Sequence, residues 1–115
     1  MNYVDGVVCA VPNENKQAYI DHAKEAAEVF KRYGALSLVE CWGDDIPEGE
    51  VNSLHSAVMR KPDETVVMSF ITWPSKAVRD AAWEKLQTDE DMQGMEMPFD
   101  GSRMIYGGFD IIVNA

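Results

Sequence analysis

The chain has 115 residues, of which 46% are hydrophobic and 26% are charged, a composition that excludes a disordered protein and suits one domain with its own core. Twenty acidic against ten basic residues give a formal net charge of −10, which repels phosphate backbones and anionic lipid. We therefore expect one domain over residues 1–115 that binds neither nucleic acid nor membranes. The first residues show no basic or long apolar segment, so we also expect a cytoplasmic protein.

The two cysteines, Cys9 and Cys41, each lie in an apolar run typical of a strand. In a chain without an export signal, such cysteines are more often reduced core residues than partners in a disulfide. We predict that both are reduced and buried.

The first third of the chain predicts a strand, a helix and a second strand. A valine-rich run from Tyr3 to Val11 predicts the first strand, and Pro12 ends it because proline cannot donate to a sheet ladder. Asn13 can cap the following helix, and Gly34 can end it in a left-handed conformation. Alternating residues from Ala35 to Trp42 predict the second strand. The apolar stripe that defines the helix is Tyr19, Ala23, Ala26, Phe30 and Tyr33.

A long connection separates this unit from the next strand. Residues 44–64 carry two prolines and a glycine, and the stretch 53–60 could form a turn or two of helix. Connections of this length in small domains often act as lids or interface arms. Residues 65–73 are rich in β-branched and aromatic side chains and predict the third strand.

The last part of the chain completes a recognisable order of elements. Ser75 can cap a second long helix, and Thr88 or Asp89 can start a short one. Residues 104–113 predict the fourth strand. The order β-α-β-β-α-β predicts an α+β, ferredoxin-like subunit, with an antiparallel four-stranded sheet and both helices on one face. The buried side of the second long helix would be Val78, Ala82 and Leu86, with Trp83 beside them.

Both faces of the third strand are apolar, although one helical layer can cover only one of them. A second copy of the chain, with the two sheets facing each other, is the simplest cover and predicts a homodimer. The alternative is that the long connection or weak contacts shield this face. The two alternating sets are Val66, Met68 and Phe70, and Val67, Ile71 and Trp73.

Four stretches of the sequence are shared with a known family: Tyr3–Gly6, Gly34–Asp45, Lys61–Glu64 and Met97–Phe109. Together they resemble the YbaA-like family of small bacterial proteins, whose function is unknown. The resemblance covers nearly the whole chain. It implies a dimeric α/β barrel built from ferredoxin-like subunits, and it implies no particular reaction.

The closing motif, residues 97–109, contains a turn sequence followed by polar side chains that could bind a ligand. Arg103 could clamp a carboxylate or phosphate with two hydrogen bonds, or pair with Asp100 or Glu96 to fix the turn. Tyr106 places a hydroxyl on an apolar ring, and the Gly107–Gly108 pair permits close approach of a bulky side chain, a partner subunit or a ligand.

Polar side chains of the first and last strands could meet. Strand alternation puts Tyr3 and Asp5 on one face of the first strand, and Tyr106 and Asp110 on one face of the last. The two strands are neighbours in a ferredoxin-like sheet, so these groups would converge. A carboxylate buried there could serve as general acid or base. Alternatively, each carboxylate lies in water or pairs with Arg103.

The histidines and several methionines are further candidates for pocket residues. His55 stands in the long connection and could reach a pocket as a lid residue, while His22 borders the helical stripe. A solvated or simply packed imidazole is the ordinary explanation for both. No metal-ligand spacing and no cofactor motif is present, so we expect neither a metal nor a cofactor. Methionines could line a pocket or a dimer seam near the closing turn: Met92, Met95, Met97 and Met104.

Three functions stay open. We expect foremost a homodimer that binds a small molecule through Arg103, Tyr106, Tyr3 and His55. The first alternative is a cofactor-independent enzyme, oxygenase-like or isomerase-like, that acts on a small apolar acid. Its catalytic candidates are His55, Asp5 and Tyr106, which together with Arg103 would have to converge on one cavity. The second alternative is a module that binds a protein partner through a flat apolar patch.

Overall fold

The computed structural model describes residues 2–115, and its main elements follow the order strand, helix, strand, strand, helix, strand. They are β1 (Tyr3–Pro12), α1 (Lys16–Arg32), β2 (Ser37–Trp42), β3 (Glu64–Trp73), α3 (Lys76–Leu86) and β4 (Ile105–Asp110). Two short helices, α2 (Leu54–Ala57) and α4 (Glu90–Gln93), and two 3-10 turns, Asn13–Asn15 and Gly101–Arg103, lie in the connections.

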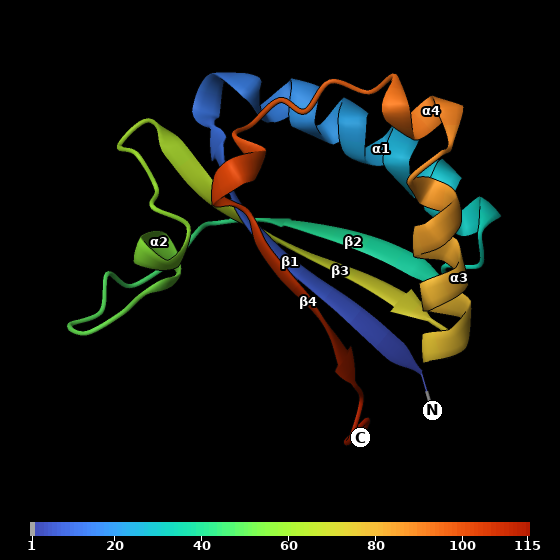
Figure 1. Ribbon diagram of the computed structural model, residues 1–115. Helices are drawn as coiled ribbons and strands as arrows, with labels where there is room; N and C mark the ends of the chain where they lie inside the picture. The colour runs from blue at the N-terminus through green and yellow to red at the C-terminus, as the bar shows by residue number, and fades with distance from the viewer. Residues whose placement is uncertain (1) are drawn as a thin grey trace.

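The strands form one antiparallel sheet in the order β2-β3-β1-β4. Figure 1 shows α1 and α3 on the same side of this sheet. The predicted ferredoxin-like fold is therefore confirmed. Directly paired residues project to the same face, so Asp5, Ile71 and Gly108 all point toward the helices.

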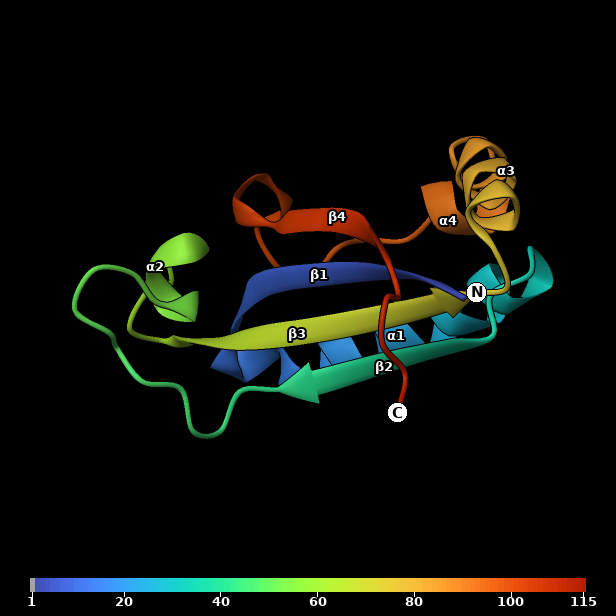
Figure 2. The same cartoon turned by 90° about the horizontal axis from the view of Figure 1, so that it is seen from below.

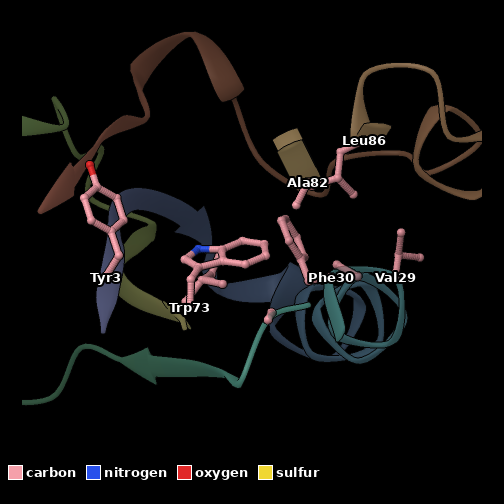
Figure 3. Packing of buried hydrophobic residues seen from close by; sticks show 9 residues of the cluster. Tyr3, Val29, Phe30, Trp73, Ala82 and Leu86 are labelled. Atoms are coloured by element: carbon pink, nitrogen blue, oxygen red, sulfur yellow. The ribbon is translucent and has the colours of Figure 1, made fainter. Parts of the chain in front are cut away.

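An aromatic cluster joins both helices to the sheet. Trp73 is fully buried, and its ring centroid lies 6.2 Å from that of Phe30, which in turn lies 5.5 Å from the ring of Trp83. Figure 3 shows the Trp73 indole facing Phe30, with Ala82 and Leu86 of α3 packed above them. Edge-to-face aromatic pairs add to the energy of burial, so this cluster fixes how α3 sits on the sheet.

The helix starts differ in how well the sequence predicted them. Ser75 caps α3, because its hydroxyl accepts a hydrogen bond from the backbone N–H of Val78 at 3.2 Å. The predicted cap at Asn13 is wrong: Asn13 lies in the 3-10 turn that delays α1 to Lys16, and its side chain accepts a hydrogen bond from Thr65. Gly34, with φ of +110°, ends α1 as predicted.

The face of the sheet away from the helices, which we call the open face, is only partly covered. Val58, at the end of α2, packs on Ala10 and Val66 at one end of this face. Figure 2 looks onto the open face, with α1 behind the sheet and α2 beyond one end. The long connection thus shields one end and leaves the remainder open. Large apolar residues exposed on the open face are Val39, Phe70, Ile105 and Phe109.

The structure corrects two further predictions. Cys9 is buried under α1, but Cys41 is exposed on the open face, because β2 is an edge strand and its odd-numbered residues point away from the helices. Both thiols are free. The last strand ends at Asp110 and not at Val113, since Asp110 pairs with Tyr3 at the very start of β1 and the sheet offers no partner beyond it. Within residues 2–115, no helix combines the length and the apolar character needed to cross a bilayer.

Candidate functional site

A cavity of about 600 Å³ lies between the helix-facing side of the sheet and the elements that cover it. Helices α1 and α3 form two walls. Helix α4 contributes Met92, and the segment between α4 and β4 contributes Met97, Phe99 and Met104. Three of the four methionines singled out from the sequence therefore line a pocket. Most of the lining is apolar, with one polar cluster on the strands.

The polar cluster centres on Glu40 of β2. The Tyr19 hydroxyl, from α1, donates a hydrogen bond to Glu40 Oε1 at 2.6 Å, and the Ser69 hydroxyl donates to the same oxygen. Ser69 is the direct partner of Glu40 across β2 and β3, so the sheet register brings them together. The Cys9 thiol lies 4.0 Å behind the Tyr19 hydroxyl.

Cys9 and Tyr19 both have raised pKa values in this cluster. Burial raises the pKa of the Cys9 thiol to about 11, so it carries its proton at neutral pH and is no nucleophile there. Burial and then the hydrogen bond to Glu40 raise the pKa of Tyr19 above its usual range. The Cys9 thiol therefore points its proton at Tyr19, and Glu40 accepts from the Tyr19 and Ser69 hydroxyls.

Asp5 also lines the cavity, but its carboxylate is already fully bonded. It accepts hydrogen bonds from the indole nitrogens of Trp73 at 2.9 Å and Trp83 at 3.0 Å. Arg79 adds three more: Nη2 donates to Oδ1 at 2.7 Å, and Nε donates to Oδ1 at 3.1 Å and to Oδ2 at 3.2 Å. Asp5 thus joins β1, β3 and α3. Neither alternative considered for it, exposure to water or a pair with Arg103, is correct, because Asp5 is buried and its partner is Arg79.

Tyr3 and Tyr106 have different surroundings. Tyr3 is buried, and the Arg79 guanidinium lies 5.4 Å from the centre of its ring. A Cβ at Gly108 would stand 2.3 Å from the Tyr3 hydroxyl and 2.9 Å from the Arg79 guanidinium, so these side chains are what approaches the glycine pair. Tyr106 lines the cavity from β4 and is 74% exposed.

Arg103 lies outside the cavity and holds the closing motif to the start of β3. Its two terminal nitrogens donate to the two carboxylate oxygens of Glu64, each at 2.7 Å, and Nε donates to Asp100 at 3.0 Å. The guanidinium lowers the pKa of Glu64. Asp100 was among the predicted turn partners, whereas Glu64 was not.

His55 belongs to a separate hollow of about 370 Å³ within residues 48–60, where its Nδ1 lies 3.0 Å from Glu48 Oε1. Of the four residues that the enzyme hypothesis needed in one cavity, the structure brings together Asp5 and Tyr106 and leaves out His55 and Arg103. Across residues 2–115, no group of three His, Cys, Asp or Glu side chains is placed to hold a metal ion.

Sequence reasoning did not identify Glu40, Tyr19 or Ser69 as a polar cluster. One signal was available: Glu40 lies between Leu38 and Trp42, at the strand positions that face the helices. A charged residue at such a position needs a hydrogen-bond or charge partner or a functional role, since burying it unpaired costs free energy.

A family model described as DUF1428, proteins of unknown function, matches residues 2–101. The chain is 52% identical to the uncharacterized protein YbaA of Escherichia coli strain K12, over 99% of each chain, and equally identical to YbaA of Shigella flexneri.

A dimeric ferredoxin-like protein from an uncultured marine organism matches in structure with a TM-score of 0.61 and 12% identity, over 99% of this chain and 98% of that one. A proposed antibiotic biosynthesis monooxygenase from Bacillus cereus matches with a TM-score of 0.57 and 12% identity, over 100% and 95% of the two chains. At such identities these structures are similar to the chain in fold alone.

Proposed function

Because the chain belongs to the DUF1428 family of proteins of unknown function, we propose a function from its own cavity: the protein is a homodimer that binds a small molecule between sheet and helices. The main support for small-molecule binding is the cavity itself. Its volume of about 600 Å³ lies within the range of small-molecule sites, which are mostly apolar and contain a few placed polar groups. The Glu40 cluster supplies those groups.

Binding in the cavity can be tested with Nile red, a neutral apolar dye that has no hydrogen-bond donor. Val7 of β1 lines the cavity, so Val7→Phe should fill part of it and weaken dye binding by about fivefold or more. The matched control is Val51→Phe, which adds the same ring at a fully exposed position of the long connection, outside both the cavity lining and the open face. Undiminished binding to Val7→Phe, or an equal loss in the control, would place the dye elsewhere and reject the proposal.

The homodimer is supported by the open face. Phe70 of β3 and Phe109 of β4 are 39% and 58% exposed there, and Val39 of β2 and Ile105 of β4 extend this apolar surface. Monomers seldom leave such a surface in water. The dimeric ferredoxin-like protein from the marine organism has a similar fold, which favours a second copy as the cover.

Sedimentation equilibrium tests the dimer. We expect a mass near twice 12.9 kDa for the wild type and a monomer for Phe70→Glu, because a carboxylate would be buried in the interface. Val51→Glu is the matched control, since Val51 is fully exposed in the long connection, away from the sheet. A monomeric wild type would reject the dimer, and capture of a different protein on this face would favour the partner-binding alternative.

A further inference from the structure

We infer that the cavity binds an apolar, preferably aromatic, molecule that carries a protonated amine, and that Glu40 is the charge partner of this amine. The inference rests on the proposed function and names the class of ligand. Three observations carry it: the unused oxygen of Glu40, the charge of the cavity lining and the rings around it.

Glu40 has one carboxylate oxygen committed to the protein and one without a protein partner. Both hydroxyl donors, Tyr19 and Ser69, bond to Oε1. Among the residues that the structure describes, Oε2 accepts no hydrogen bond, and no lysine, arginine or histidine forms an ion pair with Glu40. The two donors orient the carboxylate and leave Oε2 available to a donor that the protein itself does not provide.

The charge of the lining favours a cation. Four carboxylates line the cavity, against one guanidinium, that of Arg79, which is bonded to Asp5 and Asp80, and one imidazole, that of His22. The chain as a whole carries a net charge of −10. An anion would meet an uncompensated negative potential, whereas an ammonium would neutralise Glu40. The lining therefore does not favour the small apolar acid that the enzyme alternative named as its substrate.

Aromatic side chains surround the remaining space. The rings of Tyr19 and Phe99 lie 5.7 Å apart at their centroids, and Phe30 and Trp83 line the same cavity. Rings attract cations through their faces and pack well against an aromatic body. An arylalkylamine combines both properties in one small molecule.

The test compares tryptamine with indole-3-propionate, which replaces the ammonium by a carboxylate at the end of the same indole-ethyl skeleton. We expect tryptamine to bind the wild-type protein at least about tenfold more tightly, measured by calorimetry and by displacement of Nile red. Glu40→Gln should weaken tryptamine binding by about tenfold or more and leave Nile red binding unchanged, because the amide keeps the shape but lacks the charge. Glu28→Gln, at an exposed position of α1 outside the cavity lining, should change tryptamine binding by less than about twofold.

Equal or tighter binding of indole-3-propionate to the wild type would overturn the inference, and this comparison needs no variant to fold. An equal loss in Glu28→Gln and Glu40→Gln would also overturn it, because the effect would then come from diffuse charge and not from Glu40. If Nile red binds in the cavity but tryptamine does not, the ligand class is wrong while the proposed function stands. If neither binds, the cavity is not a binding site.

Discussion

Two aspartates of this chain have different roles because they lie at different places in the fold. Asp5 and Asp110 both interrupt apolar strands, and both appear from the sequence as candidate acids or bases. In the structure Asp5 is 3% exposed and bonded to two indoles and a guanidinium, whereas Asp110 is exposed at the end of β4. The donors of Asp5 on α3 lie more than 70 residues further along the chain, so local pattern could not identify them.

Asp5→Asn should destabilise the fold by about 3 kcal/mol, because the amide leaves the Arg79 guanidinium without its buried partner. The measurement is the free energy of unfolding from urea titration. Asp110→Asn is the matched control and should cost less than about 0.5 kcal/mol, as exposed substitutions do. A similar loss in both variants would mean that the Asp5 network contributes nothing specific.

Gly107 and Gly108 offer a second matched pair. A methyl group at Gly108 would meet the Tyr3 ring and the Arg79 guanidinium, whereas at Gly107 the nearest atom is 3.7 Å away, on Phe109. We expect Gly108→Ala to cost about 1–3 kcal/mol in unfolding free energy, as overpacked sites do, and Gly107→Ala to cost much less. The reverse order would show that Tyr3 and Arg79 yield easily to the added group.

At the scale of elements, the sequence predicted the existence and order of every main strand and helix but not the ion pairs that connect them. Strands and helices follow from local alternation and from stripes of apolar residues, which are properties of neighbouring residues. The pair of Arg103 with Glu64 joins the closing motif to β3 across 39 positions, and the cluster of Tyr19, Glu40 and Ser69 joins three elements. Such contacts depend on the register between strands, which composition does not specify.

The Arg103–Glu64 pair predicts how stability depends on pH. Arg103 lowers the pKa of Glu64 from the usual 4.5, so the pair stabilises the fold fully above about pH 4.5 and loses its effect as the pH falls through the lower folded-state pKa. Glu64→Gln should therefore unfold at lower urea than the wild type at neutral pH, and the difference should shrink on acidification below about pH 4.5. Glu28→Gln, at an exposed position of α1, is the control and should show no such trend. A constant difference between Glu64→Gln and the wild type at all pH values would contradict this account.

At the scale of the whole molecule, the isolated chain is a broad, thin slab. Its radius of gyration is 14.7 Å, above the roughly 13 Å of a typical domain of this length, and its shortest dimension is 21 Å. The sheet with helices on one side accounts for this shape, which Figure 2 shows from the open face. A second slab on that face would give a more usual ratio of surface to volume.

Net charge predicts how such a dimer responds to salt. Two copies that each carry a charge of −10 repel each other, while the apolar open face attracts. Raising NaCl from about 20 mM to about 300 mM should therefore tighten the dimer, because it shortens the range of the repulsion. Sedimentation at several salt concentrations measures the dissociation constant. Weaker association at high salt would point instead to attraction between complementary charges across the interface.

The strand order affects how readily the folded chain can aggregate through its strand edges. The two ten-residue strands, β1 and β3, occupy the centre of the sheet, and the two six-residue strands, β2 and β4, form its borders. A long valine-rich strand with unpaired backbone groups is a template for amyloid-like growth, but here six residues of each such strand, 3–8 of β1 and 67–72 of β3, have hydrogen-bonded neighbours on both sides. The edges open to strand addition are the two short strands, and one of these, β4, contains the Gly107–Gly108 pair, which has low β propensity. The chain therefore keeps its most aggregation-prone segments out of reach as long as it is folded.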